Sequence, residues 1–260
     1  MDATHTYMLH LADDALIMSQ RLSEWTGHGP ELEQDIALTN IALDYLGQAR
    51  LLYQHIAEQA NASGWQVFGG QQQGGSVTED DLAMLRLEQE YRNHLLVELP
   101  NGHWGQTVLK LFFFSTYQKL LLTQLTAFGH EPLAAIAAKS LKEVTYHQRW
   151  SAEWVIRLGA GTAQSQQRMQ QALAYLWPFT AELFEMPGYM PQNINLQAAG
   201  AEWQAMVERT LKQAELYPDS GADLGPSYQT GGLQGRHTEH LGYLLAEMQY
   251  MQRAYPNMQW

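Results

Sequence analysis

Apolar residues recur along almost the whole chain at intervals of three or four positions, the spacing of one face of an α-helix. In residues 4–25, for example, Tyr7 and Leu11 fall on such a face together with Met18, Leu22 and Trp25. The alternation of apolar and polar residues that marks a half-buried β-strand is nearly absent. The pattern therefore predicts an all-α protein.

Glycine and proline divide this pattern into separate helices. Pro30 follows one such break and suits the first turn of a helix, where its missing N–H would have no partner. The expected helices cover about residues 4–25, 30–60, 78–99, 103–128, 132–158, 163–185, 196–217 and 238–253. Pro178 predicts a kink or break inside one of them.

Long helices joined by short connections favour an antiparallel bundle. We expect a ferritin-like long-helix bundle with additional peripheral helices. Its core would consist of the four segments 30–60, 78–99, 103–128 and 132–158. No linker divides the 260 residues into balanced halves, so residues 1–260 are expected to form a single domain.

The composition excludes several classes of function. Asp and Glu number 27 against 15 Lys and Arg, for a formal net charge of −12. This balance disfavours nucleic acid and anionic membranes, which proteins bind mainly through Lys and Arg. The chain has no Cys, so it forms no disulfide and supplies no thiolate nucleophile or iron–sulfur ligand.

Neither an export signal nor a membrane span is expected. Residues 1–11 lack the basic and then apolar pattern of a signal peptide. The most apolar stretch, 108–128, contains Lys110 and Lys119, which favours a buried helix over a transmembrane one. We therefore expect a cytoplasmic protein.

A long-helix bundle raises the question of a di-iron centre. Such a centre needs a carboxylate from each of two helices and an acid-x-x-His pair from each of two others. Asp2 and His5 form the one such pair among the ten histidines of the chain, and they lie at a terminus. No expected core helix supplies a pair, so we expect no metal and no other cofactor.

Two of the expected core helices nevertheless carry polar residues on apolar stripes. Asp44 shares a stripe with Ile41 and Gln48, and Gly47 stands three positions later, where a ligand histidine would be. On another helix, Glu143 and His147 are one turn apart, at a spacing of four rather than three.

Glu90 and His94 repeat that spacing on the expected helix 78–99. Two hypotheses follow for this set. It is either a divergent metal site or a degenerate one, in which carboxylates and imidazoles satisfy one another as buried charges tend to do. We favour the second hypothesis. The candidate residues are Asp44, Glu90, His94, Glu143 and His147.

Other motifs carry weaker signals. His237 and His240 have a spacing found in zinc sites, but a closed site needs four ligands, and we expect an ordinary helix start. The glycines near them (225, 231, 232 and 235) do not match a phosphate-binding loop. We expect four further histidines, His28, His55, His103 and His130, to lie at the surface or to cap helices. Three partly apolar segments could be partner surfaces or ordinary core, namely 93–102, 177–185 and 241–255.

Several of these stretches resemble a known family. They are Ser-Gln-Arg-Leu-Ser-Glu-Trp-Thr-Gly-His at 19–28 and Asn-Ile-Ala-Leu-Asp-Tyr-Leu-Gly-Gln-Ala-Arg at 40–50, followed by 95–102, 142–147, 177–184 and 237–249. In this order they are similar to the C subunits of the ring-1,2-phenylacetyl-CoA epoxidases, which are bacterial multicomponent monooxygenases of aerobic phenylacetate catabolism. The Gln- and Gly-rich segment 61–77 matches nothing that we can assign in this family and is expected to be a surface loop.

The resemblance implies a ferritin-like fold without a functional metal centre. It also implies a hetero-oligomer with the catalytic A subunit, a related bundle that carries the di-iron site and binds phenylacetyl-CoA, and contact with other epoxidase subunits. The C subunit would support the A subunit and be catalytically silent. Two alternatives stay open: an active di-metal oxygenase with divergent ligand spacing, and a stand-alone homo-oligomeric relative of ferritin.

Overall fold

The computed structural model describes residues 2–65, 76–217, 228–256 and 258. All regular secondary structure within these ranges is helical, which confirms the all-α prediction. Most of the segment 61–77, which the sequence marks as a loop, and part of the Gly-rich segment 218–236 lie outside the described residues.

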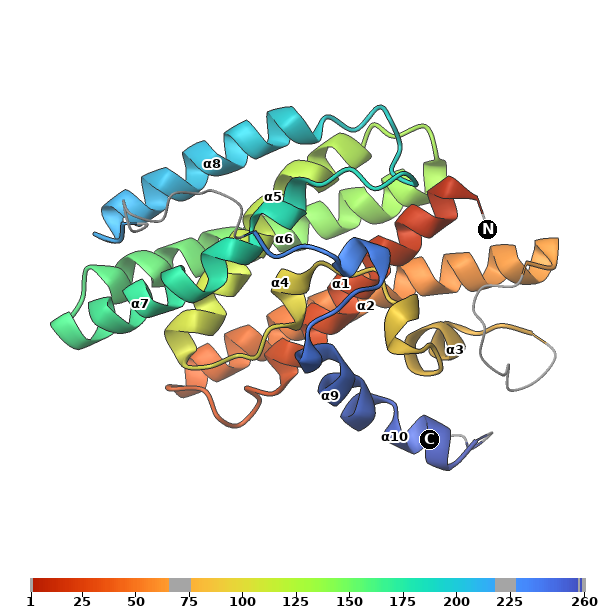
Figure 1. Ribbon diagram of the computed structural model, residues 1–260, viewed down its shortest axis with the longest axis horizontal. Helices are drawn as coiled ribbons and strands as arrows, with labels where there is room; N and C mark the ends of the chain where they lie inside the picture. The colour runs from red at the N-terminus through yellow and green to blue at the C-terminus, as the bar shows by residue number, and fades with distance from the viewer. Residues whose placement is uncertain (1, 66–75, 218–227, 257, 259–260) are drawn as a thin grey trace.

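Four long helices form the centre of the fold: α1 (Ala3–Ser23), α2 (Leu32–Ser63), α5 (Trp104–Leu125) and α6 (Glu131–Gly159). Helix α1 packs along α2, α5 packs along α6, and α2 and α6 join the two pairs (Figure 1). Local signals fix the ends of these helices. Asp2 and His130 cap the first turns of α1 and α6, and Gly64 ends α2 in the left-handed conformation, with φ of 69°.

The prediction that residues 78–99 form a core helix is wrong. This segment contains only short helices, namely α3 (Glu79–Met84), η1 (Glu88–Glu90) and α4 (Leu95–Glu98). The backbone N–H groups of Arg92 and His94 donate to the carboxylates of Asp13 and Asp14 on α1, at 2.8 Å each. These long-range bonds replace the i to i−4 bonds of a helix, and α1 occupies the core position expected for residues 78–99.

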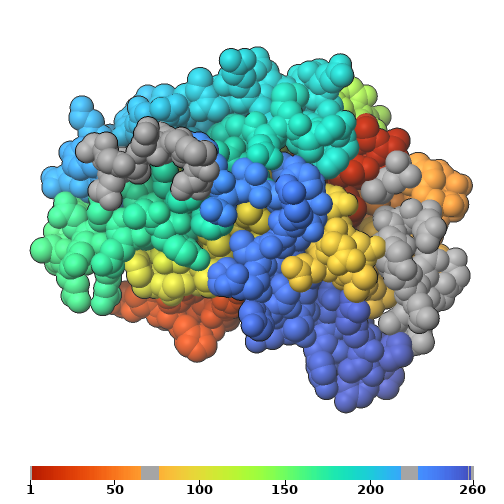
Figure 2. Space-filling model, in the orientation of Figure 1, coloured from red at the N-terminus to blue at the C-terminus, as the bar shows by residue number. Residues whose placement is uncertain are grey.

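The remaining helices pack around the bundle. Helix α7 (Ala163–Leu176) and helix α8 (Leu196–Gln213) lie against α5 and α6. The expected break near Pro178 is present, because α7 gives way to the short 3-10 helices η2 (Trp177–Phe179) and η3 (Ala181–Phe184). The C-terminal segment contains η4 (Gly232–Gln234), α9 (Glu239–Met248) and α10 (Tyr250–Ala254). Figure 2 shows this segment at the surface beside residues 79–98, and α9 contacts both α4 and η1.

Helix α5 runs through the middle of the core. Phe112, Phe113 and Phe114 follow one another, and all three are fully buried, so this helix is surrounded on every side. Its apolar composition therefore reflects a central position in the bundle. None of the described helices is long and apolar enough to cross a bilayer.

Candidate functional site

The facing sides of α2 and α6 carry two polar contacts. Asp44 Oδ2 lies 2.9 Å from Nε2 of His147, and the amide of Gln48 donates to Oε2 of Glu143 at 3.0 Å. His147 is fully buried, whereas 37% of the Asp44 side chain is exposed. The structure therefore brings together three of the five candidates, Asp44, Glu143 and His147, in neighbouring pairs.

These pairs lie at the edge of the interface and not in the bundle centre. The buried stripe of α2 runs through Ile41, Tyr45 and Gln48, and Asp44 stands beside it. A Cβ added at Gly47 would meet no atom within 4 Å, so this position faces open space. The prediction placed Asp44 and Gly47 on the core-facing stripe of this helix. In the structure the residues that follow them, Tyr45 and Gln48, occupy that stripe.

The other two candidates lie elsewhere, because residues 78–99 do not form a helix. Glu90 ends η1, and its carboxylate accepts from the backbone N–H of Leu87 at 2.7 Å. His94 precedes α4, and its Nδ1 lies 2.8 Å from Oδ2 of Asp14 on α1. The prediction that Glu90 and His94 share one helix face is therefore wrong.

His94 belongs to a fully buried cluster with Asp14 and His10. Oδ2 of Asp14 lies 2.8 Å from Nδ1 of His94 and 3.3 Å from Nε2 of His10. Burial alone would raise the pKa of Asp14, but the charges and hydrogen bonds of His94 and His10 hold it well below its usual value. Asp14 likewise raises the pKa of His94 against the opposing effect of burial. The cluster thus favours the ionised form of Asp14 and the protonated form of His94 inside the bundle.

A second buried ion pair lies beside it. Both oxygens of Asp13 accept from the guanidinium of Arg86, and Tyr53 donates to the same carboxylate at 2.6 Å. The guanidinium carbon lies 4.1 Å from the centre of the Tyr91 ring. Each member of this network has a partner, which is the condition under which buried charges are tolerated.

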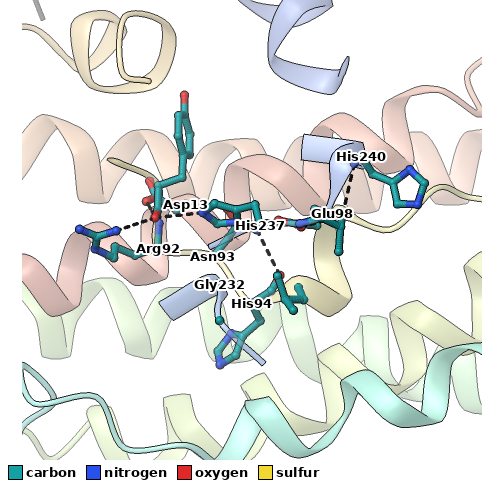
Figure 3. A network of polar contacts seen from close by, with 12 residues as sticks. Asp13, Arg92, Asn93, His94, Glu98, Gly232, His237 and His240 are labelled. Carbon is teal, nitrogen blue, oxygen red and sulfur yellow. Dashed lines mark hydrogen bonds and ion pairs between the residues drawn. The ribbon is translucent and has the colours of Figure 1, made fainter. Parts of the chain in front are cut away.

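Two more buried carboxylates hold the C-terminal segment against the bundle, and Figure 3 shows one of them, Glu98, beside His237. Glu98 lies 2.8 Å from Nδ1 of His237 and accepts from the backbone N–H of Thr238 at 2.6 Å. Glu182 accepts from the N–H groups of Gly231 and Gly232 at 2.7 and 2.8 Å. Two glycines of the C-terminal segment therefore bind a carboxylate of their own chain.

Comparison with known proteins gives the family. The family of phenylacetic acid catabolic proteins matches residues 1–260. The C subunit of 1,2-phenylacetyl-CoA epoxidase from Escherichia coli (strain K12) is 44% identical over 270 residues, covering 100% of each chain. The chain is a member of the phenylacetic acid catabolic protein family.

In this family member, two groups of three side chains could hold a metal ion within the described residues. One is the cluster of His10, Asp14 and His94, and the other consists of His5, His55 and His130. Neither group includes Asp44, Glu143 or His147. In the first group, Asp14 hydrogen-bonds to His94 and lies within ion-pair distance of His10, so the carboxylate already has two partners inside the protein.

The three segments considered as partner surfaces differ in exposure. Residues 95–99 are buried and belong to the core. In the second segment, Trp177 and Phe184 line a groove of about 460 Å³ together with Met186, Trp203 and Tyr228. In the third, Tyr243 and Tyr250 on α9 and α10 are 74% and 62% exposed.

The buried acids of α1 were missed by reasoning from sequence. Asp13 and Asp14 interrupt the stretch from Leu9 to Leu22, in which most of the remaining residues are apolar or small. Two adjacent acids within such a stretch signal buried partners, because an unpaired carboxylate is excluded from a protein core. Of their partners, His94 was predicted as a candidate, but together with Glu90, and Arg86 gave no signal of its own.

Proposed function

We propose that the chain is the C-type subunit of a phenylacetyl-CoA epoxidase, and that it pairs with and supports the di-iron A subunit without catalysing the reaction itself. The observation that carries this proposal is the end-to-end similarity to the C subunit of the E. coli enzyme, at 44% identity. A protein of this kind contributes an interface and a shape to its complex and no reacting group.

The geometry between the long helices supports the non-catalytic part of the proposal. Asp44 pairs with His147, Glu143 with Gln48, and Asp13 with Arg86, so these polar groups bond one another. A di-iron site needs carboxylates and two acid-x-x-His pairs directed at one point. The one such pair of the chain, Asp2 and His5, caps the N-terminus of α1.

The surface of α2 supports the pairing. Exposed apolar side chains lie along one outer face of this helix, which we call the α2 stripe: Leu32, Ile36, Leu43 and Leu46, exposed by 71%, 52%, 57% and 40%. Several exposed apolar side chains on one face are typical of protein interfaces. The α2 stripe is the surface on which we expect the A subunit to dock.

Co-purification and metal analysis test both parts. The chain and the A subunit are expressed together with excess ferrous iron and separated by size-exclusion chromatography. We expect one complex in which iron follows the A subunit, and we expect the C-type chain purified alone to lack a di-iron centre. Separate elution at micromolar concentration would contradict the pairing and favour a stand-alone homo-oligomer. An oxo-bridged di-iron absorption band in the chain alone would favour an active di-metal oxygenase.

A further inference from the structure

Three histidines from separate parts of the chain meet at one end of the bundle. His5 lies on the first turns of α1, His55 lies on α2, and His130 precedes α6. One ring nitrogen of each lies within 4.8 Å of those of the other two, and the ring centres are 5.4–5.9 Å apart. In Figure 1 the N-terminus of the chain and the end of α2 lie at the same end of the molecule.

Two of these imidazoles have a buried nitrogen without a hydrogen-bond partner. Nε2 of His5 and Nε2 of His55 are both in this state within the described residues. His5 is only 7% exposed. Buried polar atoms are almost always paired, and an unpaired one requires an explanation such as an ion.

The surroundings prepare His5 for metal binding. Its Nδ1 lies 2.8 Å from Oδ1 of Asp2, which also accepts the backbone N–H of His5 at 2.9 Å. A carboxylate at one ring nitrogen places the proton there and leaves the lone pair of Nε2 free, which is the usual arrangement behind a metal-bound histidine.

We propose that His5, His55 and His130 form a binding site for one divalent transition-metal ion of the zinc class, which ties α1, α2 and α6 together at this end of the bundle. Imidazole is a preferred ligand of this class. Tetrahedral zinc, with Zn–N bonds of about 2.0–2.1 Å, separates its ligand nitrogens by about 3.4 Å, so nitrogens that lie within 4.8 Å of one another have to move closer together when the ion binds. The proposal is independent of the proposed function.

The third ligand has a second role that metal binding changes. Nδ1 of His130 accepts the N–H of Leu133 at 3.3 Å and so caps α6. Binding a metal through Nε2 places the ring proton on Nδ1, and this long capping bond is then given up. His55 and His130 are half-buried, so the group lies near the protein surface, and a water molecule would supply the fourth ligand, as it does in open zinc sites.

Zinc titration of the full chain tests the proposal. The purified chain is stripped with a chelator and titrated with Zn²⁺ alone in a calorimeter, and thermal unfolding is followed with and without zinc. We expect one strong site per chain and a higher unfolding temperature with zinc. Loss of one ligand in His55→Ala is expected to weaken binding at least about tenfold and to remove the thermal shift. Equal affinity in the wild type and His55→Ala, or no strong site in the wild type, would overturn the proposal.

Matched variants separate loss of a ligand from loss of structure. His130→Asn keeps an N-cap residue at α6 but removes the ligand, so it should retain helix content by circular dichroism and still bind zinc weakly. His28→Ala removes a histidine outside the group and should bind like the wild type. In a parallel titration with Co²⁺, visible bands of a tetrahedral ion should appear in the wild type and His28→Ala. Their persistence in both ligand variants would place the ion elsewhere and overturn the proposal.

Discussion

At the scale of single residues, Lys110 is the most unusual group of the bundle. It is fully buried on α5, and its ammonium donates to the backbone carbonyl of Leu99 at 2.6 Å. Burial, together with the nearby charge of Arg21 and against the effect of Glu24, lowers the pKa of Lys110 to about 7. The ammonium group of Lys110 therefore loses a proton near neutral pH. The neutral amine that results can still donate a hydrogen bond to the carbonyl of Leu99.

This pKa predicts a pH dependence of stability. A lysine in the unfolded chain titrates near 10.4. Between about pH 7 and pH 10 the unfolded chain therefore binds more protons than the folded one, and the free energy of unfolding rises with pH. In Lys110→Met this contribution is absent, so its free energy of unfolding should rise less steeply, by up to about 1.4 kcal/mol per pH unit.

Urea denaturation at pH 7, 8 and 9 measures this slope. Lys119→Met serves as the control, because Lys119 lies on the same helix but is half-buried. Parallel pH profiles for the wild type and Lys110→Met would show that the lysine stays charged inside the bundle.

At the scale of elements, the irregular segment between α3 and α4 depends on contacts distant in sequence. Residues 78–99 have helical periodicity, and that signal was sufficient for α2, α5 and α6. It failed here because Asp13 and Asp14 bind the backbone N–H groups of Arg92 and His94, and no local pattern contains that competition. The all-α class could thus be predicted from spacing, but the identity of the fourth core helix could not.

In the candidate site, too, the sequence predicted some features and could not predict others. The contact between Asp44 and His147 follows from apolar stripes on two helices that face each other, and the sequence predicted both residues. Their place at the edge of the interface depends on the rotation of each helix about its axis, which a stripe defines only to within about one residue. His5, His55 and His130 come from three distant elements, so no spacing in the sequence could bring them together.

The Gly-rich turn before α9 offers a test of how tightly the C-terminal segment packs. A Cβ on Gly232 would lie 2.2 Å from the backbone oxygen of Asn93, a group that cannot rotate away. Gly232→Ala must therefore move the turn and weaken its bond to Glu182. We expect a loss of about 1–3 kcal/mol in the free energy of unfolding, measured in urea. Gly47→Ala is the control, because its Cβ meets nothing and alanine favours a helix by up to about 1 kcal/mol. Equal stability of Gly232→Ala and the wild type would mean that the turn adapts without loss.

At the scale of the whole molecule, the proposed pairing makes the α2 stripe the most consequential surface. Leu43 is 57% exposed near its middle. Under the proposed function, Leu43→Glu places a charge in the interface and should weaken binding to the A subunit by about 2 kcal/mol or more, with little effect on the fold of the free chain. Leu87→Glu alters another leucine, 47% exposed and outside the α2 stripe, and should bind normally. Affinity is measured by biolayer interferometry with immobilised A subunit, and equal weakening by both variants would place the interface elsewhere.

The two carboxylates that hold the C-terminal segment also have a consequence for biosynthesis. Glu98 and Glu182 are buried, and their partners include Gly231, Gly232, His237 and Thr238. Until the ribosome has translated residues 231–238, both acids lack these partners. The C-terminal segment does not yet cover residues 79–98 at that stage. A nascent or prematurely terminated chain is thus marked by unsatisfied charge and exposed apolar surface, the features that chaperones and proteases recognise.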